Sequence, residues 1–77
     1  MDKGSRLFGE VISELRRKAG VSQEALAGMA GIHRTYISQL ERGIKSPTLV
    51  VLTRIADALN TRPSRILAQW ERAIYGV

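Results

Sequence analysis

Four residues with hydrogen-bonding side chains lie within a short stretch near the middle of the chain, at positions Arg34, Thr35, Ser38 and Gln39. At about 100° per residue these side chains share one face of a helix, while Ile37 and Leu40 lie on the opposite, apolar face. Guanidinium, amide and hydroxyl groups can bind base edges: arginine pairs with guanine, glutamine with adenine, and a threonine methyl group contacts thymine. A solvated amphipathic helix has the same pattern, so this face alone is compatible with either interpretation.

The residues before this stretch predict a pair of short helices joined by a tight turn. Gly31 precedes the second helix, whose first turn His33 is placed to cap. The first helix is expected over residues 23–30, with Ser22 as its cap. Two short helices in this order form the helix-turn-helix arrangement, in which Gln23 would lie against the sugar-phosphate backbone when the second helix enters the major groove. The pair therefore favours the base-reading interpretation.

Three further amphipathic helices are predicted. Ser5 is placed to cap the first helix, which ends at Gly20 after a cation-rich turn. Thr48 is placed to cap the fourth helix over residues 49–59, and Pro63 suits the first turn of the fifth. The apolar stripes are Leu7, Phe8, Val11, Ile12 and Leu15 in the first helix, Leu49, Leu52, Ile55, Ala56 and Leu59 in the fourth, and Ile66, Leu67, Trp70, Ile74 and Val77 in the fifth.

Length and charge limit the class of protein. The 77 residues, 44% of them hydrophobic, predict one all-α domain over residues 1–77. Twelve Lys and Arg against seven Asp and Glu give a net charge of +5, which favours an anionic partner such as nucleic acid. Residues 1–5 lack a signal-peptide apolar run, and no stretch is apolar enough to span a membrane. We therefore expect a soluble, cytoplasmic protein with no membrane partner.

The sequence contains no pattern typical of a catalytic or metal-binding site. His33 is the single histidine, and there is no Cys or clustered carboxylate pair that could complete a metal site or a general-base pair with it. A helix cap or a phosphate neighbour is the better interpretation of this residue. The serines lie outside any nucleophile elbow, and the glycines are too scattered for a phosphate-binding loop. We expect no enzyme, no metal and no cofactor.

The helix-turn-helix pair and its flanks resemble the lambda-repressor-like DNA-binding domain of the Cro and XRE type. The matching runs are residues 21–27 (VSQEALA), 34–43 (RTYISQLERG) and 46–49 (SPTL), followed by Leu52, Ile55, Ala56 and Leu59. The resemblance covers roughly residues 7–67. Within the family, residues 34–38 are most similar to small controller proteins of restriction-modification systems and to phage-type regulators, a run that many short regulators share.

The resemblance implies five helices, a dimer on a pseudo-palindromic operator, and base readout by Arg34, Thr35, Ser38 and Gln39. Contacts with the DNA backbone are assigned to Ser22, Gln23, Tyr36, Arg42, Lys45 and Ser46. The family also places an ion pair at the positions of Arg16 and Glu41, where an unpaired carboxylate beside the core would be costly. No ligand-sensing domain appears before Val77, so no small-molecule ligand is expected.

The last helix, over about residues 63–75, is expected to contribute to dimerisation. A helix in so small a domain can bury only part of its stripe, so we expect Leu67 and part of Ile66 to pack inward. The apolar remainder would form a two-fold interface of Ile66, Trp70 and Ile74. The alternative is that this helix folds back to complete the monomer core.

Together these features predict a homodimeric, sequence-specific, double-stranded DNA-binding transcriptional regulator that controls a restriction-modification system or its own gene. The alternative from another class is an antitoxin-like or scaffolding module whose main role is to bind a protein partner.

Overall fold

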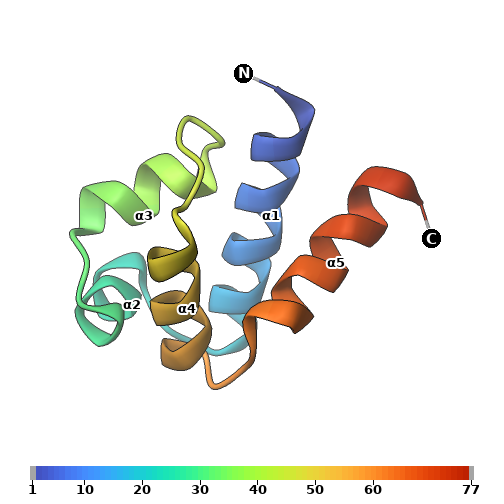
Figure 1. Cartoon of the computed structure of the whole chain (residues 1–77). Coiled ribbons are helices and arrows are strands. Elements are labelled where there is room, and N and C mark those ends of the chain that lie inside the picture. The colour runs from blue at the N-terminus through green and yellow to red at the C-terminus, as the bar shows by residue number, and fades with distance from the viewer. Residues whose placement is uncertain (1, 77) are drawn as a thin grey trace.

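The computed structural model describes residues 2–76 as five helices with no strand among them (Figure 1). The helices are α1 (Lys3–Lys18), α2 (Gln23–Ala30), α3 (Arg34–Glu41), α4 (Leu49–Ala58) and α5 (Pro63–Tyr75). The predicted all-α fold, with α2 and α3 as its helix-turn-helix, is confirmed. Val77, which the sequence places in the apolar stripe of the last helix, lies outside the described residues.

Polar side chains begin four of the five helices. Ser22 Oγ accepts a hydrogen bond from Ala25 N at 3.0 Å, and Thr48 Oγ1 accepts one from Val51 N at 3.1 Å. Each bond satisfies a backbone donor that the helix itself leaves unpaired. α5 has no side-chain cap and instead begins with Pro63, whose missing N–H costs nothing at this position.

The start of α1 differs from the sequence prediction. The expected cap, Ser5, lies inside the first turn, and Asp2 holds the cap position. Asp2 Oδ1 accepts a hydrogen bond from Ser5 N at 2.9 Å. A carboxylate accepts this bond as serine does and also interacts favourably with the positive end of the helix dipole, so the helix begins at Lys3.

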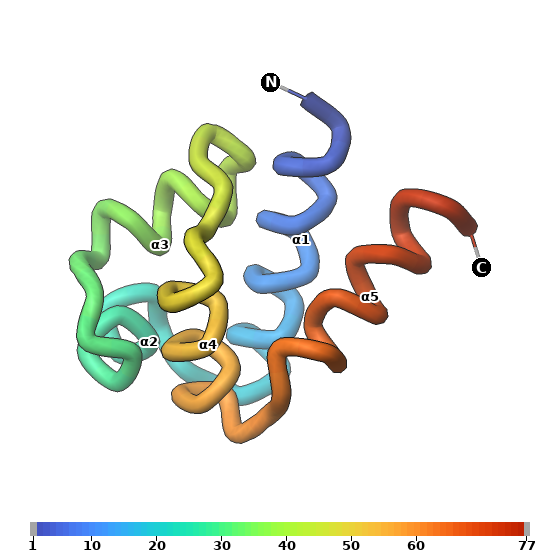
Figure 2. The backbone as a smooth tube through the Cα atoms, viewed as in Figure 1, coloured from blue at the N-terminus to red at the C-terminus, as the bar shows by residue number. Residues whose placement is uncertain are grey.

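One apolar core fills the space between the helices. α1 lies between α3 and α5, and α4 packs against α2 and α5 (Figure 2). The largest fully buried side chains come from all five helices and are Ile12, Leu26, Ile37, Leu40, Ile55 and Ile66. Because every helix contributes to one core, the orientation of α3 depends on the packing of the other four.

The last helix folds back onto α1, with a rotation that differs from the prediction. Ile66 is fully buried and Leu67 is 37% exposed, so the expectation that Leu67 packs inward is wrong. The indole Nε1 of Trp70 donates to Gly4 O at 2.8 Å, and its ring meets Phe8 edge-on with centroids 6.3 Å apart. α5 therefore contributes to the monomer core through Ile66 and Trp70, and Ile66 is not available for an interface.

The start of α4 also departs from the prediction. Leu49, which the sequence places on the core face, is 80% exposed, whereas Leu52 and Ile55 are buried as expected. Leu49 is the first residue of the helix and lies about one turn before Leu52, the first buried side chain of α4. It borders a groove that also involves α1, α5 and the loop before α4.

α1 and α3 approach each other closely at Gly9, which is buried. A Cβ atom built on Gly9 would lie against the backbone carbonyl oxygens of Leu40 and Glu41, 2.5 Å from the latter. Real Cβ atoms do not approach a backbone oxygen so closely, so glycine allows α3 to pack at this distance.

Candidate nucleic-acid interface

The turn between α2 and α3 sets the geometry of the candidate interface. α2 ends at Gly31, whose φ of 69° lies in the left-handed region that favours a residue without Cβ. Ile32 N then donates to Ala27 O at 3.0 Å. His33 caps α3 as predicted, because its Nδ1 accepts a hydrogen bond from Thr35 N at 3.1 Å. The two helices therefore join through the short turn that the sequence predicts.

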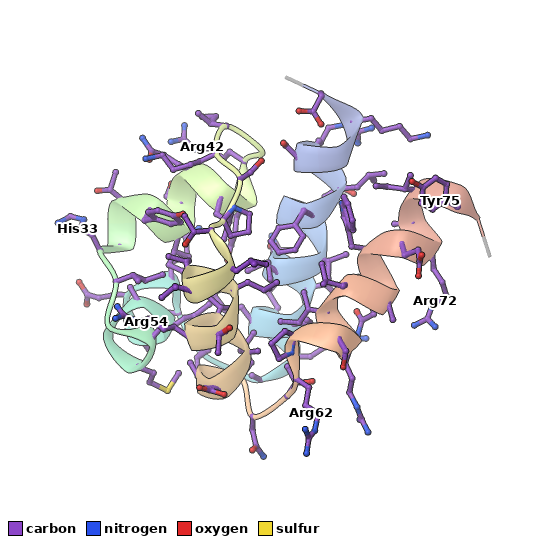
Figure 3. The ribbon with its side chains drawn as sticks, viewed as in Figure 1. His33, Arg42, Arg54, Arg62, Arg72 and Tyr75 are labelled. Atoms are coloured by element: carbon purple, nitrogen blue, oxygen red, sulfur yellow. The ribbon has the colours of Figure 1, made fainter. Side chains whose placement is uncertain are left out.

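α3 separates its apolar and polar side chains onto two faces. Ile37 and Leu40 are fully buried. The candidate base-reading side chains lie on the outer side and are Arg34, Thr35, Ser38 and Gln39. The first two residues are exposed and the second two are half-buried. Figure 3 shows the side chains of His33 and Arg42 extending outward from opposite ends of this helix.

The loop between α3 and α4 brings further polar groups beside this face. Tyr36 packs at the edge of the core, and its hydroxyl donates to Ser46 O at 3.5 Å. Lys45 Nζ lies 5.1 Å from the centroid of the Tyr36 ring, within the range of a cation–π interaction. Ser46 Oγ lies 3.0 Å from Ser5 Oγ, so this loop also contacts the first turn of α1.

A polar bracket, formed by Arg16, Glu41 and Gln23, holds α3 against α1 and α2. Arg16 Nε and Nη2 donate to the two carboxylate oxygens of Glu41 at 2.7 and 3.1 Å, so the expected ion pair is present. Gln23 Nε2 donates to Glu41 Oε1 at 3.0 Å, and Arg16 Nη1 donates to Val21 O at 3.0 Å. The side chains of Arg16 and Glu41 are 13% and 6% exposed. The hydrogen bonds from Arg16 to Glu41 raise the pKa of Arg16.

The sequence does not predict the role of Gln23 in this bracket. The sequence places Gln23 at the DNA backbone, whereas in the structure its amide donates a hydrogen bond to Glu41. Gln23 nevertheless lies at the start of α2 in a shallow depression shared with Ser22 and Arg34, next to the outer face of α3. The signal that could have identified this contact is the position of Gln23 at the end of α2 that faces α3.

α3 and the loop after it carry positive charge that is not neutralised by ion pairs. Arg34, Arg42 and Lys45 form no ion pair within residues 2–76. Glu41, the carboxylate of α3, is paired with Arg16. Arg42 Nε donates to Ser38 O at 3.4 Å. An anion that approaches this face therefore meets cations and hydrogen-bond donors without an opposing free carboxylate on the helix.

Neither a cluster of metal-ligating side chains nor a membrane-spanning helix is found within residues 2–76. Within the described part of the chain, no three His, Cys, Asp or Glu side chains come together as potential metal ligands. The helices of residues 2–76 are also too short or too polar to cross a membrane. The groups gathered at α3 are those of hydrogen bonding and charge recognition.

Comparisons with known proteins agree with this geometry. The HTH_3 family, described as helix-turn-helix, matches residues 12–66. The chain is 40% identical over 62 residues to control protein C.BamHI of Bacillus amyloliquefaciens, covering 79% of this chain and 76% of that protein. It is 31% identical over 71 residues to y4dJ, an uncharacterised HTH-type transcriptional regulator of Sinorhizobium fredii, covering 92% of each.

A solved structure supports the same relationship. The restriction-modification controller protein C.AhdI from Aeromonas hydrophila matches with a TM-score of 0.77 and 38% identity, covering 79% of this chain and 92% of that one. These relatives are named as control proteins and transcriptional regulators rather than as enzymes.

Proposed function

Because this chain belongs to the HTH_3 helix-turn-helix family, we propose that it is a sequence-specific transcriptional regulator that binds double-stranded DNA through α3. The observation that carries the proposal is the outer face of α3, where hydrogen-bonding side chains lie beside cations and the carboxylate of the helix itself, Glu41, is paired with Arg16. The Arg16–Glu41–Gln23 bracket fixes the orientation of this face. Base readout needs donors and acceptors held in a fixed position on a rigid element, which is what this arrangement provides.

In the proposed complex, the N-terminal end of α3 enters the major groove. Arg34 and Thr35 lie at this end and contact base edges first. Ser38 and Gln39 lie one turn further along the same face and complete the base contacts. Arg34 is the strongest single candidate, because its guanidinium can donate two parallel hydrogen bonds to one guanine.

Contacts with the flanking phosphates are proposed for Ser22, Gln23, Arg42 and Lys45, and for Tyr36 once its hydroxyl exchanges the long 3.5 Å bond to Ser46 O for a phosphate oxygen. Ser22 Oγ accepts its capping bond from Ala25 N, so its hydroxyl hydrogen is free to donate to a phosphate oxygen. Arg42 and Lys45 supply charge at the other end of α3. Ser46 stands apart from this set, because its hydroxyl already bonds Ser5.

A homodimer is proposed through the apolar groove beside α5. The groove has a volume of about 360 Å³ and is bordered by Phe8, Pro47, Leu49, Leu67 and Trp70. Leu49 and Leu67 are among the exposed large apolar residues, whereas Ile66 is fully buried. This interface differs from the one expected from the sequence, because Leu49 and Leu67 take the place of Ile66. Trp70 forms one edge of the groove. Ile74 is half-buried on the same helix and does not line the groove.

The similarity to control proteins supports a narrower proposal, that the regulated genes are those of a restriction-modification system or the gene of this chain itself. Neighbouring restriction and methyltransferase genes would support this target. A neighbouring toxin gene would instead favour the alternative of an antitoxin-like module whose groove binds a protein partner.

The experiment that tests the proposal is selection of binding sites from random duplex DNA. We expect enrichment of one pseudo-palindromic sequence with two identical half-sites. Enrichment of a single unpaired half-site would contradict the dimer but keep the DNA-binding proposal. Recovery of unenriched sequences at low salt would contradict sequence-specific binding.

A further inference from the structure

A hydrogen-bonded chain links the first turn of α1 to the loop that carries Lys45. Ser5 Oγ lies 3.1 Å from Asp2 Oδ2 and 3.0 Å from Ser46 Oγ. Ser46 lies directly after Lys45 and 41 positions after Ser5 in the sequence. The start of the chain is therefore tied to a segment that we place at the DNA backbone.

The direction of these hydrogen bonds follows from counting hydrogens. A serine hydroxyl has one hydrogen, whereas an ionised carboxylate can only accept. The hydrogen bonds from Ser5 lower the pKa of Asp2, so Asp2 is ionised near neutral pH and takes the hydrogen of Ser5. Ser46 must then donate its own hydrogen to Ser5 Oγ. With this bond made, Ser46 has no hydrogen left for a phosphate oxygen.

We propose that Asp2, Ser5 and Ser46 form a clamp that positions the loop for DNA binding, and that Ser46 acts by holding this loop rather than by donating to DNA. The inference rests on the proposed function. It removes Ser46 from the direct backbone contacts expected from the sequence. It also assigns roles to Asp2 and Ser5, which lie outside the helix-turn-helix.

The clamp gives the loop a second anchor in addition to its contact with Tyr36. The Tyr36 hydroxyl donates to Ser46 O, and its ring lies under the ammonium group of Lys45. Ser46 is therefore anchored through its carbonyl to α3 and through its hydroxyl to α1. Lysine loses much rotamer freedom when it binds a phosphate, so a loop held in place beforehand reduces the ordering cost of binding.

The test compares operator binding by Ser5→Ala, Ser46→Ala and the double variant, measured by fluorescence anisotropy on the selected site. Ser5→Ala keeps the Asp2 cap, because that bond uses the backbone N–H of Ser5. We expect each single variant to weaken binding by about two- to tenfold, the range of one modest hydrogen bond. The double variant should lose no more than either single variant, because both break the same link.

Direct donation from Ser46 to a phosphate predicts a different result. Ser46→Ala would then weaken binding more than Ser5→Ala, and the two losses would multiply in the double variant. Either that pattern or wild-type binding by Ser5→Ala overturns the clamp. Ser5→Thr keeps the hydroxyl and should bind the operator as tightly as the wild type. Ser64→Ala removes an exposed hydroxyl on α5 and is the control for the loss of a surface serine.

A measurement without DNA separates failure of the clamp from failure of the proposed function. Backbone ¹⁵N relaxation of the free protein should show lower order parameters at Lys45 and Ser46 in Ser5→Ala than in the wild type or Ser5→Thr. Unchanged order parameters would contradict the clamp even if the protein binds DNA. Absence of DNA binding by the wild type, with the expected change in order parameters, would contradict the proposed function alone.

Discussion

Arg34 and Lys45 are cations beside the same face of α3, yet their positions predict different losses on substitution. Arg34 begins the helix, where base edges are approached, so Arg34→Ala should cost about 1–3 kcal/mol and relax preference at one position of each half-site. Lys45 lies in the loop, so Lys45→Ala should weaken binding to all DNA sequences alike. It should also lower the slope of log affinity against log salt concentration by about one unit per protomer.

The measurement for this pair is binding to the operator, to single-base variants of it and to random duplex over a salt series. Equal losses on every sequence for Arg34→Ala would contradict base readout by this residue. A change in base preference for Lys45→Ala would contradict the phosphate assignment.

Glu41 accepts hydrogen bonds from Arg16 and Gln23 at a nearly buried position. Glu41→Ala leaves the guanidinium of Arg16 and the amide of Gln23 without their carboxylate acceptor. The free energy of unfolding, measured by urea denaturation, should therefore fall by about 1–3 kcal/mol. Arg16→Ala should cost a similar amount. The double variant should show coupling between the two positions, and strictly additive losses would mean that the pair contributes nothing to stability.

Asp2 makes the stability of α1 depend on pH in the acid range. Hydrogen bonds from the backbone and side chain of Ser5 lower its pKa from the ordinary value of 3.8. A lowered carboxyl pKa adds stability that is fully present above 3.8 and is lost as the pH falls through the folded-state value. Asp2→Asn keeps an acceptor for Ser5 N but does not titrate. The difference in Tm between the wild type and this variant should therefore shrink on acidification, whereas parallel Tm curves would contradict the linkage.

At the scale of elements, two glycines inside helices have opposite roles. Gly28 lies in α2, and a Cβ atom there would meet nothing within 4 Å, so Gly28→Ala should raise the free energy of unfolding by about 0.5–1 kcal/mol. Gly9 faces the backbone of α3, which cannot move away as a flexible side chain could. Gly9→Ala should therefore lower the free energy of unfolding by about 1–3 kcal/mol despite the better helix propensity of alanine.

Urea denaturation of the two alanine variants measures this contrast directly. If Gly9→Ala were as stable as the wild type, the close approach between α1 and α3 would be absent in solution. Weaker DNA binding by a folded Gly9→Ala protein would show that the spacing of these helices also sets the orientation of α3.

The elements that were predicted correctly depend on short-range signals. Ser22, His33 and Thr48 cap helices through bonds to residues two or three positions away. Such bonds follow from residue type and spacing, and the outer face of α3 follows from the helical period. Ser5 and Asp2 illustrate the limit of this reasoning, because both are good caps, and the carboxylate prevails through its interaction with the helix dipole.

The features that were missed depend on contacts between distant segments. The rotation of α5 is set by the hydrogen bond from Trp70 to Gly4 and the packing of Phe8, so spacing within the helix could not reveal that Ile66 is buried and Leu67 exposed. The amide contact of Gln23 and the Ser5–Ser46 link likewise need the fold to bring their partners together.

At the scale of the whole molecule, the proposed dimer decides how much DNA is read. α3 spans residues 34–41, enough for one half-site, and two copies related by a two-fold axis would present two such helices about one DNA turn, roughly 34 Å, apart. The affinities of the half-sites then combine, because the second contact is intramolecular once the first has formed.

The dimer can be tested without damage to the core, because Leu49 and Leu67 are 80% and 37% exposed. Leu49→Ser combined with Leu67→Ser should leave the circular dichroism spectrum unchanged and shift the protein to monomer in sedimentation velocity. Operator binding should weaken while binding to an isolated half-site stays the same. Val50→Ser is the matched control, since Val50 is 62% exposed on α4 but lies outside the groove. A wild-type protein that is monomeric at tens of micromolar, or a double variant that still dimerises, would contradict this interface.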